Sequence, residues 1–192
     1  TEIRAATVAG GFPHGLSALS VRVAEVAGAV EGGAQEVDVV IRREWPLTGK
    51  WDLLHEEISE LRAAAGNAHL KVILGTGEHE TLNQIARSAL TAMLAGADFV
   101  KTSTGKERVN ATLPAGLAMA KAVREFYEET GTAAGIKPAG GIRTAAEALR
   151  WRRLVGEELG QEWTDATLFR IGASGLLDNI VTSLEAAVVS SE

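Results

Sequence analysis

Two lysines lie at the carboxyl ends of apolar segments, where a lysine is seldom found. Lys101 closes the run Ala97–Lys101, and Lys137 follows Ala134–Ile136. Each could be a long side chain that reaches solvent or a structurally paired cation, because lysine is rarely buried alone. If both point into one site, desolvation and repulsion between their charges lower the pKa of one of them. A neutral amine can then attack a carbonyl group, as Schiff-base chemistry requires.

A carboxylate in a third apolar segment could move protons for these lysines. Asp38 interrupts the branched residues of Glu36–Ile41, where an unpaired carboxylate would be costly. Alternation along a strand places Asp38 and Val40 on the face opposite Val37 and Val39. Asp38 could be an acid or base in catalysis, or it could hold a lysine in a structural ion pair. Under both interpretations, pairing with one of the lysines would satisfy the negative charge of Asp38.

Three loops of small residues precede helical segments: Thr102–Lys106, Gly140–Thr144 and Gly172–Gly175. Glycines let backbone N–H groups approach an anion at a helix N-terminus, and Lys106 and Arg143 add positive charge. A single Gly-Gly turn is weak evidence, because most are only tight turns. Three such loops beside two lysines of this kind predict a phosphate-binding site.

The composition excludes several classes of protein. The chain has 192 residues, of which 46% are hydrophobic and 23% charged, and its formal net charge is −6. These values predict a globular domain with a sizeable core, and the acidic excess argues against binding of nucleic acid. No run approaches the ~18 apolar residues of a membrane span, so we expect no membrane partner and a cytoplasmic location. Without cysteine, thiolate sites are excluded, and the histidines have no ligand spacing, so no metal site is predicted.

The elements that must position these residues alternate between two types. Short apolar runs predict buried strands over 3–8, 36–41, 70–74, 98–101, 135–137 and 168–171. Helical periodicity covers the segments between and after them, 17–32, 50–65, 81–94, 114–129, 145–159 and 176–189. Thr48 and Thr144 are expected to cap the helices that follow them. Strands and helices in alternation predict an α/β fold with a parallel sheet.

Two architectures fit six strand-helix units. Their spacing matches a (β/α)₈ barrel of the TIM type, but such a barrel needs eight units and about 250 residues. An open six-stranded, doubly wound sheet would be complete with the units present. In both, the carboxyl ends of the strands carry the site. Periodicity alone does not separate the two.

Long motifs of this chain resemble the deoxyribose-phosphate aldolase family. The segments Ala97–Lys106, Lys137–Thr144 and Phe169–Ser174 carry the resemblance in that order, together with Phe12–Gly15 and Glu36–Val40. The resemblance covers essentially the whole chain. It implies a TIM barrel, with the six units corresponding to the third to eighth of that fold, so residues 1–192 would form a single, incomplete barrel domain.

The same resemblance implies roles for the candidate residues. Lys101 would be the Schiff-base nucleophile, Lys137 the lysine that activates it, and Asp38 the acid that relays protons with water. The substrate phosphate would be held by Gly105, Lys106, Gly140, Gly141, Arg143, Gly172 and Ser174. The reaction would be the reversible cleavage of 2-deoxy-D-ribose 5-phosphate to acetaldehyde and D-glyceraldehyde 3-phosphate. It would need no metal or organic cofactor.

The chain also departs from the family pattern. The first two strands of the family have no counterpart, and one hydroxyl near the last helix is replaced by Gly175. Six strands would leave two open edges, so we expect a longer natural chain, or a completing segment or subunit such as a second copy. Two other functions remain open: a Schiff-base aldolase for another phosphorylated sugar, and a phosphosugar-binding module with impaired catalysis.

Overall fold

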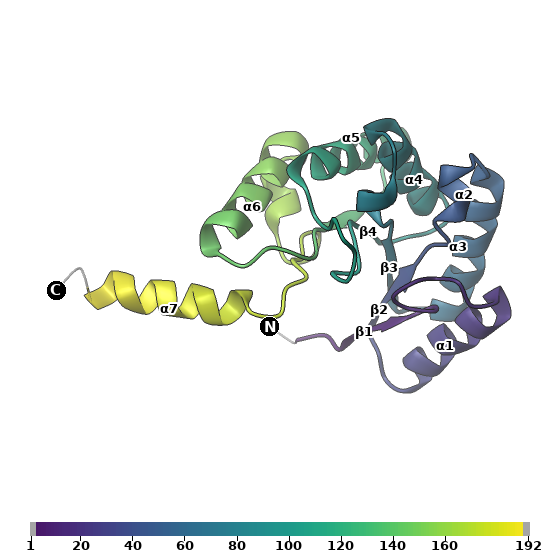
Figure 1. The fold of residues 1–192 in the computed structure, drawn as a ribbon, viewed down its shortest axis with the longest axis horizontal. Coiled ribbons are helices and arrows are strands. Elements are labelled where there is room, and N and C mark those ends of the chain that lie inside the picture. Colours follow the sequence, from purple (N-terminus) through teal and green to yellow (C-terminus); the bar gives the residue numbers. More distant parts are fainter. Residues whose placement is uncertain (1–2, 190–192) are drawn as a thin grey trace.

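The computed structural model describes residues 3–189, with the side chains of residues 3–186 (Figure 1). The strands are β1 (Ala6–Ala9), β2 (Glu36–Val40), β3 (His69–Ile73), β4 (Phe99–Lys101) and β5 (Gly135–Lys137). The helices are α1 (Leu19–Glu31), α2 (Glu44–Leu47), α3 (Trp51–Ala65), α4 (Leu82–Leu94), α5 (Leu113–Thr130), α6 (Ala145–Leu159) and α7 (Leu176–Val189). Two 3-10 turns, η1 (Thr76–Glu78) and η2 (Gln161–Thr164), lie between them. The predicted alternation of strands and helices is confirmed.

The order of the strands decides between the two architectures. All neighbours are parallel, and the order across the sheet is β1-β2-β3-β4-β5, the same as in the sequence. A doubly wound sheet reverses its order at a switch point and carries helices on both faces. Here each crossover between parallel strands advances in the same direction, and the helices lie in an arc along one side of the sheet (Figure 1). This is the wall of a barrel, and the doubly wound alternative is wrong.

The sixth predicted strand, 168–171, is only partly formed. It joins β5 through two isolated parallel bridges, Ile136 with Phe169 and Ala139 with Gly172. The amides of Arg170 and Gly172 still donate to carbonyl groups on the β5 side. Pro138 lies between the two bridge positions Ile136 and Ala139. It has no N–H to donate, so the hydrogen-bond ladder breaks there. The segment therefore occupies a strand position without forming a regular strand.

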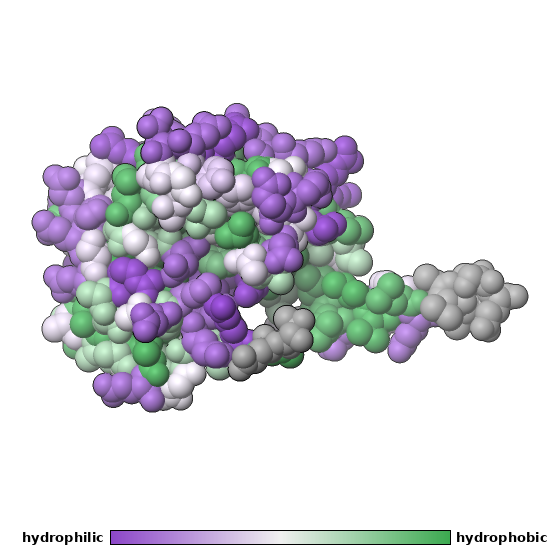
Figure 2. Space-filling view, turned by 180° about the vertical axis from the view of Figure 1, so that it is seen from behind, coloured by the Kyte–Doolittle hydropathy of each residue, from purple (hydrophilic) through white to green (hydrophobic). Residues whose placement is uncertain are grey.

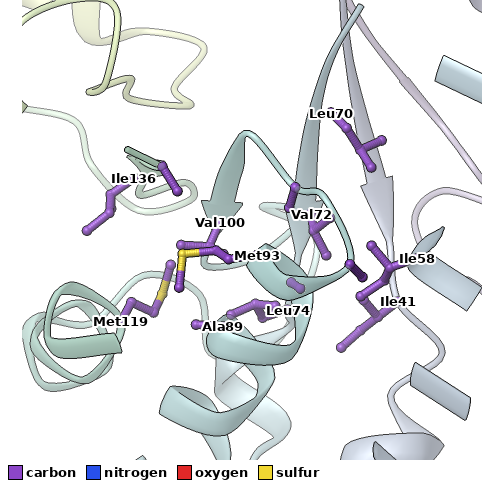
Figure 3. Packing of buried hydrophobic residues seen from close by; sticks show 14 of the residues in the cluster. Ile41, Ile58, Leu70, Val72, Leu74, Ala89, Met93, Val100, Met119 and Ile136 are labelled. Carbon is purple, nitrogen blue, oxygen red and sulfur yellow. The ribbon is translucent and has the colours of Figure 1, made fainter. Parts of the chain in front are cut away.

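The main hydrophobic core lies between the outer face of the sheet and the helices. Val72, Val100 and Ile136 point outward from three adjacent strands and are fully buried. They pack with Met93 of α4 and Met119 of α5, as Figure 3 shows. Burial of a side chain of this size contributes about 1.5–3 kcal/mol. This packing fixes which side chains of each strand point the other way, toward the concave inner face.

The inner face carries charged residues among apolar ones such as Val40 and Ile73. Asp38, Lys71 and Phe99 lie side by side in the register of β2, β3 and β4. Gly135 follows Phe99 in the register of β5, and a Cβ there would overlap the Phe99 ring. The predicted alternation in β2 is confirmed, since Val37 and Val39 belong to the core while Asp38 does not.

The predicted helix caps have different outcomes. Thr144 forms a capping box with Glu147 at the start of α6, as its position indicated. Thr48 does not begin a helix. It follows the short helix α2, which the sequence analysis missed, and its hydroxyl donates to the carbonyl of Glu44.

Helix α7 extends away from the rest of the chain, and its apolar surface is visible in Figure 2. Leu177 and Leu184 are exposed, whereas Leu176 joins Ile142 and Trp151 in a small second cluster.

Within residues 3–189, no helix is long and apolar enough to cross a membrane. The assignment of residues 1–192 to a single, incomplete domain stays a prediction.

Candidate active site

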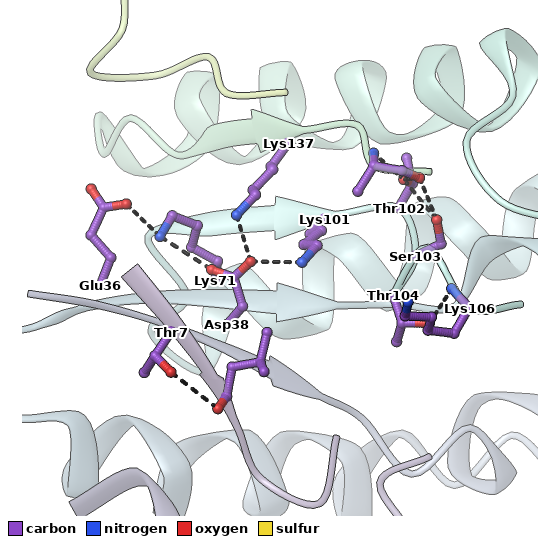
Figure 4. Close-up of polar contacts among 12 residues, drawn as sticks. Thr7, Glu36, Asp38, Lys71, Lys101, Thr102, Ser103, Thr104, Lys106 and Lys137 are labelled. Atoms are coloured by element: carbon purple, nitrogen blue, oxygen red, sulfur yellow. Dashed lines mark hydrogen bonds and ion pairs between the residues drawn. The ribbon is translucent and has the colours of Figure 1, made fainter. Parts of the chain in front are cut away.

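Two lysine side chains converge on one carboxylate oxygen. The Nζ atoms of Lys101 and Lys137 donate to Oδ2 of Asp38 at 2.7 and 2.6 Å. The three residues come from β4, β5 and β2, and they meet on the concave face of the sheet (Figure 4). Lys101 and Asp38 are buried, and Lys137 is half-buried. The structure thus brings together the three residues for which the sequence analysis expected chemistry.

A third lysine, which the sequence analysis missed, completes this cluster. Lys71 of β3 is fully buried, with its Nζ 2.6 Å from Glu36 Oε2 and 3.2 Å from Asp38 Oδ1. Arg170 adds a further cation, 3.2 Å from Glu36 Oε1. A signal was present in the sequence, because Lys71 interrupts the apolar run 70–74 as Asp38 interrupts its own run. Since the two residues are register partners on neighbouring strands, their side chains lie side by side on the same face of the sheet.

The charges of this cluster shift two pKa values that matter for proton transfer. Burial by itself raises the pKa of the Asp38 carboxyl. The ammonium groups around it outweigh burial, Lys101 most strongly and then Lys137 and Lys71, and the pKa falls to about 2. Burial also lowers the pKa of Lys137, and the charges of Lys101 and Lys71 lower it further, while Asp38 opposes them. Asp38 is therefore an anion at neutral pH, and Lys137 loses its proton more readily than an ordinary lysine.

The aromatic ring of Phe99 lies beside two cations of this lysine cluster. Lys71 Nζ lies 5.8 Å and Arg170 Cζ 5.7 Å from the centroid of its ring, within the range of a cation–π interaction. The electron-rich ring face stabilises cations that have little access to water. Because a Cβ at Gly135 would overlap this ring, the absence of a side chain there leaves room for Phe99 beside the charges.

A pocket of about 360 Å³ opens beside Lys101 and Lys137. Both lysines belong to its lining, and so does every residue predicted to hold the phosphate: Gly105, Lys106, Gly140, Gly141, Arg143, Gly172 and Ser174. Asp38 lies beyond the lining, behind the two lysines that it binds. The predicted nucleophile and the predicted anion site therefore share one cavity.

The loops around the pocket are built for close approach of the backbone. Gly140 and Gly141 have φ of 83° and 85°, in the left-handed region that favours glycine. The buried hydroxyls of Thr102 and Ser103 donate to the carbonyl of Ala139, 3.3 and 2.6 Å away, and tie the β4 loop to the β5 loop. The pocket thus combines exposed backbone, helix N-termini and the charges of two basic side chains, which is what a phosphate group requires.

A larger cavity, of about 750 Å³, lies at the amino end of the strands. Arg4, His69 and Arg170 line it, but neither Lys101 nor Lys137 does. We place the site in the smaller pocket because the carboxyl ends of parallel strands, the lysine pair and the glycine loops coincide there. In the described part of the chain, no three His, Cys, Asp or Glu side chains gather as ligands for a metal ion would.

Comparison with known proteins identifies the family. The model of the DeoC/LacD family of aldolases matches residues 8–177. The chain belongs to this family. It is 54% identical over 179 residues to the deoxyribose-phosphate aldolases of Mus musculus and of Homo sapiens. The alignment covers 93% of the chain but 56% of each of these relatives, so the chain spans about half the length of the curated DeoC/LacD aldolases it matches.

Solved structures in the family share the fold. A crystal structure from Toxoplasma gondii ME49, named as a candidate deoxyribose-phosphate aldolase, aligns with a TM-score of 0.83 and 26% identity. That alignment covers 99% of this chain and 72% of the other. A similarly named structure from Coccidioides immitis gives a TM-score of 0.79 and 29% identity over 94% of this chain and 64% of that one. The predicted α/β fold of the TIM-barrel type is confirmed for the part of the barrel that is present.

Proposed function

We propose that this chain carries the site of a Schiff-base aldolase that reversibly cleaves 2-deoxy-D-ribose 5-phosphate. The products are acetaldehyde and D-glyceraldehyde 3-phosphate. One observation carries the proposal: Lys101 and Lys137 share Oδ2 of Asp38 beside a pocket lined by glycine loops and two basic side chains. The 54% identity to aldolases named for this substrate supports the choice of 2-deoxy-D-ribose 5-phosphate among phosphorylated sugars.

Lys101 is the nucleophile in this proposal. Its neutral amine attacks the aldehyde carbon C1 of the open-chain sugar, and loss of water gives a protonated imine. The C2–C3 bond then breaks, its electrons move to the iminium nitrogen, and the C3 hydroxyl loses its proton to form the aldehyde of D-glyceraldehyde 3-phosphate. The enamine that remains takes up a proton at C2, and hydrolysis releases acetaldehyde. The protonated imine is itself the electron sink, so no metal or organic cofactor takes part.

Asp38 and Lys137 carry out the proton transfers in this proposal. Since the pKa of Asp38 is about 2, its carboxylate holds no proton at neutral pH and acts as an acceptor. Lys137 is 2.6 Å from it and has a lowered pKa, so it is the better proton donor of this pair. We assign the donation to Lys137 or to a water on Asp38, and the orientation of both to the carboxylate.

The phosphate group lies at the other end of the pocket. There the backbone of Gly140, Gly141 and Gly172 and the side chains of Arg143 and Lys106 supply donors and positive charge. Ser174 adds a hydroxyl at the N-terminus of α7. With the phosphate held there, C1 of an open-chain pentose reaches toward Lys101.

We also propose a homo-oligomer. The deoxyribose phosphate aldolase of Aeropyrum pernix is described as tetrameric. In this chain, the exposed Leu177 and Leu184 of α7 offer apolar surface for such contacts.

Borohydride trapping tests the proposed function. The protein is incubated with 2-deoxyribose 5-phosphate, reduced, and analysed by intact mass and peptide mapping. We expect a stable adduct on Lys101, and neither adduct nor turnover in Lys101→Leu. The matched control is Lys121→Leu, since Lys121 is exposed on α5.

Two other results would replace the proposal. A folded protein that binds the phosphosugar without an adduct would be a binding module. An adduct that forms faster with a different phosphorylated sugar would identify an aldolase for that sugar.

A further inference from the structure

Arg43 connects three loops at the carboxyl ends of neighbouring strands. It follows β2, and its side chain is 12% exposed. Its Nε lies 2.9 Å from Glu78 in the turn after β3, and one terminal nitrogen lies 3.5 Å from Glu107 in the loop after β4. A guanidinium can hold two carboxylates at once, because its donors point in fixed, divergent directions. Arg43 is not part of the lysine cluster and does not line the pocket.

The carboxylate of Glu107 continues this connection into the predicted phosphate loop. It accepts the backbone N–H of Thr104 at 3.2 and 3.1 Å through its two oxygens. The hydroxyl of Thr104 in turn accepts the N–H of Lys106 at 3.1 Å. Thr104, Gly105 and Lys106 all line the pocket. A chain of contacts thus runs from Arg43 through Glu107 to the backbone that lines the pocket.

The glycines of the β3 loop make room for this arrangement. A Cβ at Gly75 would come within 2.5 Å of Arg43 Cδ, and one at Gly77 would overlap the carbonyl of Val109. The Arg43 side chain therefore packs directly against Gly75, and the β3 and β4 loops are in close contact at Gly77 and Val109. Glu107 is only 7% exposed, so without Arg43 its carboxylate would be left almost buried with no cation beside it.

We propose that Arg43 is a positioning residue for phosphate binding. It holds Glu107, and through Glu107 it fixes the backbone of Thr104–Lys106 in the conformation that receives the phosphate group of the substrate. This inference rests on the proposed function for the identity of the substrate, but the geometry of the loop is independent of it. Loss of Arg43 leaves Lys101, Lys137 and Asp38 in place, since none of them contacts it.

The test compares Arg43→Gln with Arg42→Gln. Arg42 is the adjacent arginine, and it contacts Glu44 and the carbonyl of Leu16 instead of Glu107. In Arg43→Gln we expect KM for 2-deoxyribose 5-phosphate to rise about tenfold, with kcat and the rate for unphosphorylated 2-deoxyribose close to wild type. Hydrogen exchange of residues 102–112 should become faster in Arg43→Gln and stay at the wild-type rate in Arg42→Gln.

Several results would overturn the inference. One such result is hydrogen exchange of residues 102–112 in Arg43→Gln at the same rate as in the Arg42→Gln control. Another is an equal loss of activity on the phosphorylated and the unphosphorylated sugar. If the wild type cleaves no phosphosugar, the proposed function fails, and the inference is then tested by hydrogen exchange and by binding of inorganic phosphate. If Arg43→Gln does not fold, Glu78→Gln removes the more exposed of the two carboxylates and should produce smaller changes in the same direction. No change in Glu78→Gln would also overturn the inference.

Discussion

Lys137 Nζ lies 2.6 Å from Asp38 Oδ2, although the two residues are 99 positions apart in the sequence and their strands are not neighbours. Strands β3 and β4 separate them in the sheet. In a flat sheet, strands are about 4.8 Å apart, so two residues three strands away could not touch. The contact therefore depends on the curvature of the barrel wall, which turns the side chains of all strands toward a common centre.

Lys137→Leu tests the electrostatic relation between the two lysines of the pocket. The substitution removes one positive charge beside the nucleophile, and the Asp38 carboxylate then has one competitor fewer for Lys101. We expect the pH at which imine formation is half-maximal to move upward, because a positive charge that favours a neutral amine in the pocket has been removed. Stopped-flow or trapping rates between pH 6 and about 10 measure this shift. A profile equal to that of the wild type would remove Lys137 from this role.

Lys71→Met tests the buried lysine that the sequence analysis missed. Glu36 keeps Arg170 as a partner, but Asp38 Oδ1 loses the one cation that is paired with it among the described residues. We expect the free energy of unfolding to fall by about 1–3 kcal/mol, the range for a buried polar group left without its partner. Turnover should fall about 10- to 100-fold, since Oδ1 of Asp38 loses the contact that helps Lys101 and Lys137 to orient the carboxylate. Urea denaturation and steady-state kinetics measure both effects, with Lys121→Met as the surface control. Unchanged stability would show that the cluster does not need Lys71.

Asp38 makes stability depend on pH in the acid range. The lysines around it lower the pKa of the Asp38 carboxyl from its ordinary 3.8 to about 2 in the folded protein, so the folded state binds the proton less well than the unfolded state. The stabilisation is complete above about pH 4 and is lost as the pH falls through about 2. A shift of this size corresponds to about 2 kcal/mol. Thermal melts from pH 7 to about 2 should show this loss, and Asp38→Asn should lack this component. An identical pH dependence in both proteins would contradict the prediction.

Arg143→Gln separates phosphate binding from the chemical step. Arg143 is exposed at the mouth of the pocket, and among the described contacts only its backbone is engaged, with Glu147 and Asn179. Loss of its charge should raise KM for the phosphorylated sugar about tenfold and leave KM for the unphosphorylated sugar unchanged. Arg153→Gln, an exposed arginine on α6 outside the pocket lining, is the matched control. If both sugars lost activity to the same extent, Arg143 would not act through the phosphate.

Much of the site could be predicted from local sequence, because its reactive residues can be recognised within single strands and loops. Lysines at the ends of apolar runs, a carboxylate within one, and glycines before helices are local signals, and the residues that carry them line or adjoin one pocket. Lys71 was missed although it carries the same kind of signal. Its place in the site depends on the register that puts it beside Asp38, and register is a property of two strands.

The sequence alone determined the alternation of strands and helices, the faces of β2 and the residue types of the site. Hydrophobic period and residue chemistry are local, so they can be read without knowing what lies nearby in space. Only the tertiary structure decided that the strands follow one another in sequential order, that Pro138 breaks the sixth, and that Arg43 reaches Glu107. These features depend on contacts between segments far apart in the chain, whose geometry is set by the packing of the helices on one face of the curved sheet.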